Sequence, residues 1–328
     1  MENIGTIELE KGEYFTAINE KTNTVYVANN HSDSILVIDG SAKKIVNKIS
    51  IERPRELVIN SDNNTLYAIS GKAGWRLRQG LGKKISIINL TTNQITGLIG
   101  EKEGFGNIKL NQKTKLLYAT QFNSKKVWVI DTLTNTVKEK INVGAKYRSI
   151  AIDEINNIIY LAGREGFSEK LSYALIRGND NHTEKMDSKI GFRSNTIWEL
   201  YYNQNNNKLY AFVETMPVGD GNPTVSIQVF DINSKSFGEK TESRFWGNGM
   251  GFDQSKNRFY FSDVQNGEFS VLNDSLEEIG LFRFTKEKGF VEKHLKGHNL
   301  HSKIAINPNG GLIYIAGSKM SLLHIIKE

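Results

Sequence analysis

The chain has 328 residues with 38% hydrophobic and 10% aromatic content, which supports a folded core and excludes a wholly disordered protein. It contains no cysteine, which excludes disulfides, cysteine-ligated metals and thiol nucleophiles. Lysine and arginine number 42 against 36 aspartate and glutamate, and the net charge of +6 favours an anionic partner.

Nothing in the sequence indicates a membrane segment or a targeting signal. No apolar run approaches the roughly 20 residues that span a bilayer. The first residues lack the basic and apolar regions of a secretory signal peptide, although a secreted chain with its signal removed would look the same. We therefore expect no membrane insertion and no signal peptide in this sequence.

One short segment recurs seven times along the chain. In every copy a tyrosine follows an asparagine or aspartate by seven residues. In chain order the tyrosines are Tyr26, Tyr67, Tyr118, Tyr160, Tyr210, Tyr260 and Tyr314. The residues that precede them are Asn19, Asn60, Asn111, Asp153, Asn203, Asp253 and Asn307. Each copy predicts two apolar strands joined by a polar turn, because short polar side chains favour turn geometry.

Two further strands follow most copies. The third strand ends in an acid or its amide, at Asp39, Asn89, Asp131, Asp231 and Asn273. A weaker fourth strand comes next, as at residues 44–51 and 136–143, and no stretch shows sustained helical periodicity. Four antiparallel strands per copy, with tyrosines 41 to 54 residues apart, predict the blades of a β-propeller. We call the strands of a blade A to D from the inside outward.

The two ends of the chain supply the missing parts of one blade. A strand at residues 3–9 precedes the first copy, and one strand at residues 321–327 follows the seventh. Pairing these strands in the last blade closes the ring and removes two exposed edges. The sequence therefore predicts an all-β, seven-bladed β-propeller with four antiparallel strands per blade, a single domain over residues 1–328.

Residues 25–51 and 127–153 carry a family resemblance. Their Tyr-Val-x-Asn and Val-Ile-Asp-x-x-Thr patterns resemble the YVTN repeat, and the layout of the chain is similar to the YncE-like proteins. The resemblance implies a periplasmic or secreted, seven-bladed, DNA-binding protein. Residues 173–181 in blade 4 depart from the pattern, as do the long insertions.

The insertions and the excess positive charge fall on one face. The substantial insertions, at residues 71–84, 163–171, 214–224 and 285–302, are all B–C or D–A connections. These connections together carry about +8, so the rest of the chain is slightly negative. Such cations neutralise phosphates, and aromatic side chains among them can stack on bases. The alternative is a solvated charged surface with aromatics that fill gaps between blades.

We assign candidate ligand-binding residues to this face. They are Arg55, Trp75, Arg76, Arg78, Lys83, Lys84, Lys126, Tyr147, Arg148, Arg193, Trp246, Asn248 and His301. Further cations in these loops are Arg53, Lys72, Lys125, Lys146 and Lys189. Arg55, Arg148 and Arg193 come just before the A strands of blades 2, 4 and 5, where convergent guanidinium groups would hold a carboxylate or phosphate of a small anionic ligand.

Catalytic and metal-binding patterns are weak. His294, His298 and His301 have the spacing of one helical face, but Gly297 interrupts it, and we expect a solvated loop rather than a metal site. No serine lies in a Gly-x-Ser-x-Gly elbow, and no loop fits a phosphate-cradling motif. We assign no catalytic residue, metal or cofactor.

Three functional hypotheses follow. The first is a non-catalytic, monomeric binding protein that engages DNA or another polyanion through the B–C and D–A loops. The second is a hydrolase resembling the propeller lactonases, acting on a small anionic substrate at the channel mouth. The third is a protein- or glycan-binding surface module.

Overall fold

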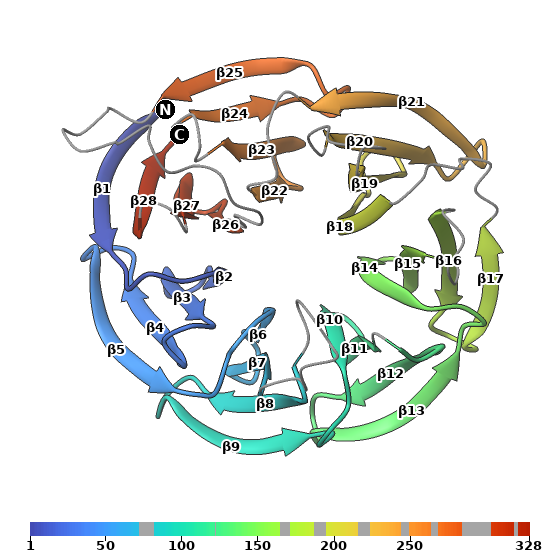
Figure 1. Cartoon of the computed structure of the whole chain (residues 1–328), viewed down its shortest axis with the longest axis horizontal. Coiled ribbons are helices and arrows are strands. Elements are labelled where there is room, and N and C mark those ends of the chain that lie inside the picture. The colour runs from blue at the N-terminus through green and yellow to red at the C-terminus, as the bar shows by residue number, and fades with distance from the viewer. Residues whose placement is uncertain are drawn as a thin grey trace, which may run out of the picture. The chain divides into compact units, whose positions relative to one another are not determined.

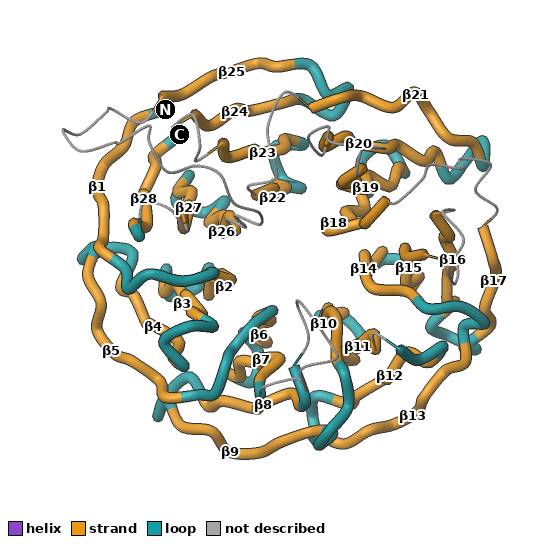
Figure 2. The backbone as a smooth tube through the Cα atoms, viewed as in Figure 1, coloured by secondary structure: helices purple, strands orange, loops and turns teal. Residues whose placement is uncertain are grey.

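The computed structural model describes residues 1–71, 82–121, 123–164, 171–186, 195–215, 224–243, 249–263, 268–283, 303–317 and 321–328. Within these ranges the regular secondary structure is β-strand, joined by turns and loops (Figure 2). The strands form seven antiparallel sheets of four strands each, which correspond to the seven predicted blades (Figure 1). The described residues include no helix with the length and hydrophobicity that a membrane crossing requires.

The chain forms two compact units, and unit 1 spans Met1–Arg55 and Arg244–Glu328. It contains blades 1, 6 and 7. Blade 1 comprises β2 (Tyr14–Asn19), β3 (Thr24–Asn29), β4 (Ser34–Asp39) and β5 (Lys44–Ser50). Blade 6 comprises β22 (Gly249–Asp253), β23 (Arg258–Asp263), β24 (Glu268–Leu272) and β25 (Glu278–Arg283). Blade 7 comprises β26 (Lys303–Asn307), β27 (Leu312–Gly317), β28 (Leu322–Lys327) and β1 (Glu2–Glu8).

Unit 2 spans Glu56–Ser243 and contains blades 2 to 5. Blade 2 comprises β6 (Leu57–Asn60), β7 (Thr65–Ser70), β8 (Lys84–Asn89) and β9 (Gln94–Ile99). Blade 3 comprises β10 (Phe105–Asn111), β11 (Leu116–Gln121), β12 (Lys126–Asp131) and β13 (Thr136–Asn142). Blade 4 comprises β14 (Tyr147–Asp153), β15 (Ile158–Arg164), β16 (Leu171–Arg177) and β17 (His182–Met186), and blade 5 comprises β18 (Asn195–Asn203), β19 (Lys208–Thr215), β20 (Thr224–Asp231) and β21 (Ser236–Ser243). The inner strands β6, β10, β14 and β18 contact one another in that order, so these blades are consecutive neighbours.

The N-terminal strand completes the last blade, as the sequence predicted. The sheet order is β1-β28-β27-β26, and β1 pairs antiparallel with β28 from Glu2 opposite Lys327 to Glu8 opposite Leu322. The first and last strands of the chain are therefore hydrogen-bonded neighbours, which protects the edge of β28.

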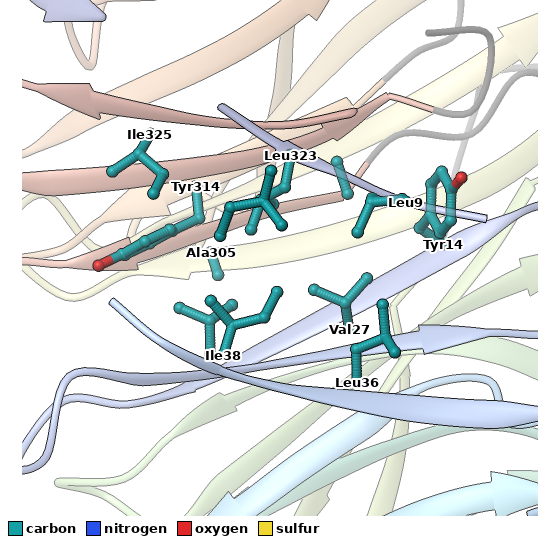
Figure 3. Close-up of a cluster of buried hydrophobic side chains, with 12 residues drawn as sticks. Leu9, Tyr14, Val27, Leu36, Ile38, Ala305, Tyr314, Leu323 and Ile325 are labelled. Atoms are coloured by element: carbon teal, nitrogen blue, oxygen red, sulfur yellow. The ribbon is translucent and has the colours of Figure 1, made fainter. Parts of the chain in front are cut away.

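The repeat tyrosines are buried, which also confirms a prediction. All seven have an exposed fraction of 3% or less. In unit 1, Tyr314 of blade 7 packs with Ala305 and Ile325 against Val27 and Ile38 of blade 1 (Figure 3). The apolar faces of neighbouring sheets thus form the core between blades, because each sheet can bury its faces only against the next one.

The A–B turns share one backbone geometry. In blades 1 to 6 the turn-opening Asn or Asp accepts backbone N–H groups of the turn with its side-chain Oδ1, for example Asn111 from Lys113 at 3.0 Å and from Thr114 at 3.1 Å. Each turn ends on a residue with positive φ. These residues are Asn23, Asn64, Lys115, Asn157, Asn207, Asn257 and Gly311. Asparagine is frequent there because it tolerates the left-handed conformation better than most residues.

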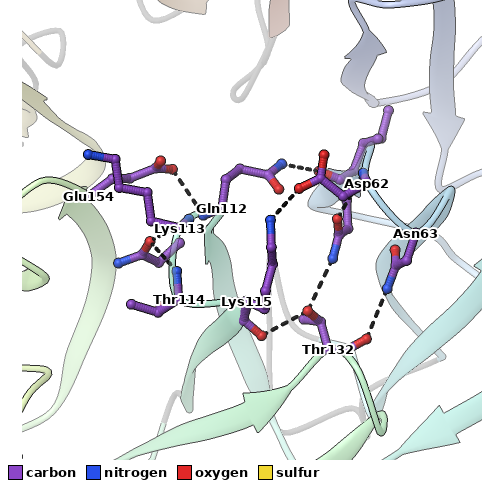
Figure 4. Close-up of polar contacts among 11 residues, drawn as sticks. Asp62, Asn63, Gln112, Lys113, Thr114, Lys115, Thr132 and Glu154 are labelled. Atoms are coloured by element: carbon purple, nitrogen blue, oxygen red, sulfur yellow. Dashed lines mark hydrogen bonds and ion pairs between the residues drawn. The ribbon is translucent and has the colours of Figure 1, made fainter.

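Polar side chains also join neighbouring A–B turns in unit 2 (Figure 4). Lys115 of blade 3 forms an ion pair with Asp62 of blade 2. The backbone N–H of Gln112 in blade 3 donates to Oε1 of Glu154 in blade 4 at 3.2 Å. The A–B end of these blades is therefore held together by side chains of the turns themselves.

Candidate functional site

The B–C and D–A connections of blades 2 to 4 in unit 2 lie at the same end of their sheets, because the strands are antiparallel. The described cations in these connections and on the first two residues of the strands that follow them are Lys83, Lys84, Lys102, Lys125, Lys126, Lys146 and Arg148. The described acids of these connections are Glu56, Glu101 and Glu103. Lys83, Lys102, Lys125, Lys126 and Lys146 are exposed. This end of blades 2 to 4 is thus predominantly positive, and we call it the basic edge.

A short β-bridge anchors part of the basic edge. The N–H of Gly82 donates to the carbonyl of Phe105 at 3.3 Å, and the N–H of Phe105 donates back to Gly82 at 3.0 Å. The N–H of Glu103 donates to the carbonyl of Lys83 at 3.0 Å. Gly82 must be glycine here, because a Cβ would lie 2.4 Å from the side chain of Ile69. The bridge fixes the backbone of Lys83 against the chain that enters blade 3.

A chain of hydrogen bonds holds Glu103 on the basic edge. The indole N–H of Trp128 donates to Oε1 of Gln121 at 2.9 Å, and Nε2 of Gln121 donates to the Glu103 carboxylate. Trp128 packs edge-on against Phe105, with ring centroids 5.2 Å apart, and Lys140 Nζ lies 3.6 Å from the centre of its ring. The acid is therefore bound to the interior of blade 3.

Arg148 lies in a β-bulge of β14. The register of β14 against β15 shifts between Tyr147 and Ser149, so Arg148 is the extra residue. Thr120 of blade 3 donates its hydroxyl to the Arg148 carbonyl at 3.0 Å, which fixes the bulge from the neighbouring blade. Burial lowers the pKa of the Arg148 guanidinium. Bulges redirect side chains, and a partly desolvated guanidinium interacts strongly with an anion because the local dielectric constant is low.

Gly163 allows the chain before Arg148 to approach β15. A Cβ on Gly163 would lie 2.5 Å from the Lys146 carbonyl oxygen and 2.8 Å from Cα of Tyr147. Because Gly163 has no side chain, the backbone of residues 146–148 can lie directly against β15.

Arg55, in unit 1, is balanced by an acid. Its Nη1 lies 3.6 Å from Oε2 of Glu13, and the two side chains are 12% and 25% exposed. Nδ2 of Asn30 donates to the same carboxylate. The positive charge of Arg55 is thus offset locally, in contrast to the exposed lysines of the basic edge.

The structure describes only some of the predicted site residues. Lys83, Lys84, Lys126 and Arg148 share the basic edge, whereas Tyr147 is 2% exposed and its hydroxyl lies 3.2 Å from the Ser172 hydroxyl. The buried ring of Tyr147 has no face on which a base could stack. The predicted residues outside the described ranges are Trp75, Arg76, Arg78, Arg193, Trp246, Asn248, His301 and, for the histidine cluster, His294 and His298.

Sequence reasoning missed three residues that shape this edge. Lys102 belongs to a D–A connection, so its position alone was a usable signal. The contact between Glu103 and Gln121 carried no signal, because Glu103 lies in a D–A connection, Gln121 ends β11, and only the fold brings them together. Among the residues that the structure describes, no group of three or more His, Cys, Asp or Glu side chains could hold a metal ion.

Comparisons with known proteins decide the fold. No protein-family model matches the chain, and no curated protein matches it. The chain is similar to the structure of Kuenenia stuttgartiensis hydrazine synthase, with a TM-score of 0.72 and 12% identity over 98% of this chain and 97% of that one. It is also similar to the β-propeller domain of Myceliophteria thermophila Cps50 (Swd1), with a TM-score of 0.67 and 12% identity over 99% of this chain and 98% of that one.

The chain is a seven-bladed β-propeller. At 12% identity the likeness extends to the fold alone, because one propeller scaffold supports many unrelated functions. The functional argument therefore rests on the basic edge and not on either of these similar structures.

Proposed function

We propose that the chain is a non-catalytic binding protein that engages DNA or another polyanion through the basic edge. The observation that carries the proposal is the one-sided charge of this edge: seven described cations against three acids, five of the cations being exposed. Exposed lysines bind phosphate backbones by displacing condensed counterions, without a fixed geometry. The edge needs no preformed pocket for this role.

The rigid mounting of the edge supports the same proposal. The Gly82–Phe105 bridge fixes the Lys83 backbone. The hydrogen bond from Gln121, which is itself bonded to Trp128, restricts the rotation of the Glu103 side chain. Fixed charges lose less conformational entropy when a ligand binds than charges on a mobile loop. In this proposal the cations around Glu103 make the ligand contacts.

We place the chain among the YVTN-repeat, YncE-like propellers as part of this proposal. The tyrosine and turn pattern of blades 1 to 3 supports that placement. A periplasmic or secreted location and DNA binding follow from the kinship and belong to the proposal with it. A small anionic ligand would use Arg148, which belongs to the same edge.

Fluorescence anisotropy with labelled single-stranded and duplex DNA, and with heparin as a competitor, tests the proposal over a range of salt concentrations. Wild type should bind with an affinity that falls steeply with salt. The variant in which Lys83, Lys84, Lys125 and Lys126 are all changed to glutamine should bind far more weakly. Its log–log salt slope on single strands should be smaller by up to about 3, because each phosphate contact contributes about 0.7.

A matched variant tests whether binding depends on the charge of the basic edge or only on the net charge of the protein. Lys44, Lys113, Lys138 and Lys327 are exposed lysines outside the B–C and D–A connections, and changing all four to glutamine alters the net charge equally. This control should bind like wild type. Equal loss of binding in both variants, or no loss in either, would contradict the proposal. Saturable hydrolysis of a lactone that Arg148→Met abolishes would instead favour an enzyme at the channel mouth.

A further inference from the structure

The A–B turn of blade 7 carries an exposed Asn–Gly pair. Asn309 and Gly310 are both exposed, and within the described ranges they form the only Asn–Gly sequence. The residues at the position of Gly310 in the other six turns are Thr22, Asn63, Thr114, Asn156, Asn206 and Lys256. Blade 7 is therefore the one blade in which the residue after the turn centre has no side chain.

The local geometry leaves the backbone N–H of Gly310 weakly held. It donates to the carbonyl of Asn307 at 3.3 Å, and the N–H of Gly311 donates to the carbonyl of Pro308 at 3.4 Å. Both distances are long for backbone hydrogen bonds, so this turn opens at low cost. Gly310 also has no Cβ to obstruct the approach of its nitrogen to the Asn309 side chain.

We propose that Asn309 is a site of spontaneous deamidation and isomerisation, independent of the polyanion-binding function. The Gly310 backbone nitrogen attacks Cγ of Asn309, a C–N bond forms, and the side-chain nitrogen leaves as ammonia with the proton from Gly310. Water then opens the five-membered imide at either carbonyl. The net change is hydrolysis of the amide to a carboxylate, as aspartate or as isoaspartate, with no oxidant or reductant.

The site matters because this turn joins three blades of unit 1. Nδ2 of Asn307 donates to Oδ1 of Asn23 in blade 1 at 2.8 Å. The carbonyl of Gly311 accepts the N–H of Glu328 at 2.9 Å, and the Glu328 side chain reaches Lys256 of blade 6. Isoaspartate inserts a methylene group into the backbone between these two anchor points. Isomerisation should therefore lower the stability of the blade that closes the chain.

The molecule contains its own control. Asn205 occupies the same turn position in blade 5 and is also exposed, but Asn206 follows it. Peptide mapping by mass spectrometry after incubation of the intact protein at mildly alkaline pH should find deamidation several-fold faster at residue 309 than at residue 205. Isoaspartate at residue 309 should also accept a methyl group from an isoaspartyl methyltransferase. Equal rates at the two positions would overturn the proposal.

Two variants separate the deamidation of Asn309 from its effect on stability. Gly310→Ala should remove most of the deamidation and still fold, because its Cβ would have only an ordinary contact, 3.5 Å from Leu312. Asn309→Asp adds the charge without changing the backbone. Aged wild type should unfold at a lower temperature than both variants. If Gly310→Ala deamidates at the wild-type rate, or if aged wild type is as stable as fresh protein, the inference is wrong.

Discussion

The substitution Gly311→Asn should stabilise the protein, because it supplies a hydrogen-bond donor that one buried carboxylate lacks. Asp253, which opens the A–B turn of blade 6, is 3% exposed. Its Oδ1 accepts the backbone N–H groups of Ser255 at 2.9 Å and Lys256 at 3.2 Å. Its Oδ2 has no hydrogen-bond partner among the described residues.

Equivalent residues in other blades show what is missing. Nδ2 of Asn111 in blade 3 donates to Oδ1 of Asn157, the residue that ends the turn of blade 4, at 2.9 Å. Nδ2 of Asn307 makes the same contact to Asn23 of blade 1. The residue that ends the A–B turn of blade 7 is Gly311, so at the position equivalent to Asn157 and Asn23 there is no side chain to pair with Asp253 of blade 6.

The magnitude follows from two terms. Gly311 has φ of +59°, which asparagine tolerates, and removing a glycine from the unfolded chain contributes about 0.5 kcal/mol. A new hydrogen bond to a buried carboxylate contributes about 1.5 kcal/mol or more. The only atom within 4 Å of the new Cβ is Lys256 Nζ, at 4.0 Å, so no clash offsets the gain. We expect about 2 kcal/mol, or a rise of about 3 °C in Tm for a chain of this size.

Differential scanning calorimetry and urea titration measure the effect, and Gly311→Ala is the control. Alanine removes the same glycine but has no donor and is strained at positive φ, so it should lower the stability. The gain from asparagine should largely disappear when Asp253 is also changed to alanine, which can neither accept nor donate a hydrogen bond at this position. If Gly311→Asn is no more stable than Gly311→Ala, or gains equally in both backgrounds, the assignment of Oδ2 to this position is refuted.

Three further predictions concern named groups. Burial lowers the pKa of His324 to about 4, so the unfolded chain binds a proton between pH 6.5 and 4 that the native state does not. Stability is therefore complete above pH 6.5 and should fall by about 2 kcal/mol between pH 7 and pH 5 in urea titrations, a slope that His324→Gln should flatten. Glu328→Gln should lower the free energy of unfolding by about 2 kcal/mol in calorimetry, because the carboxylate is 13% exposed and pairs with Lys256 and Arg258. An unchanged Tm would show that these ion pairs do not stabilise the protein. Gly163→Ala should destabilise by about 2 kcal/mol through overlap with the backbone before β14, which thermal unfolding would detect.

The fold was predictable because the repeated sequence pattern marks the same strands and the same turn in every blade. A tyrosine that recurs after a turn-forming Asn or Asp fixes the strand phase in every blade, and the burial of Tyr67 and Tyr314 bears this out. The closing pair β1–β28 followed from counting strands at the two ends. The hydrogen bonds that the turn residues form between neighbouring blades were not predictable. Asn111 and Asn157 lie far apart in sequence, and only the packing of blades brings their side chains to 2.9 Å.

The candidate site was predictable to a smaller extent. The positions of Lys83 and Lys125 in B–C connections follow from strand counting, and antiparallel pairing places them at one end of the blades. Strand counting does not predict which cations are paired with acids, because that depends on which loops contact each other in the fold. Arg55 looked like a ligand residue until the fold placed Glu13 beside it, and no local pattern links residues 42 positions apart.

The same contacts explain why the two ends of the blades differ in the length of their connections. At the A–B end, the turn residue of one blade hydrogen-bonds to the next blade, as Asn60 does to Thr132 at 3.1 Å and Asn307 to Asn23 at 2.8 Å. An insertion there would displace a buried donor or acceptor, which costs about 1 to 3 kcal/mol at each junction. At the B–C and D–A end the connections vary in length, and in the described part of one of them Gly82 pairs with Phe105 of the next blade through backbone hydrogen bonds. Backbone contacts of this kind place few demands on side chains, so this end is free to acquire a charge pattern such as the basic edge.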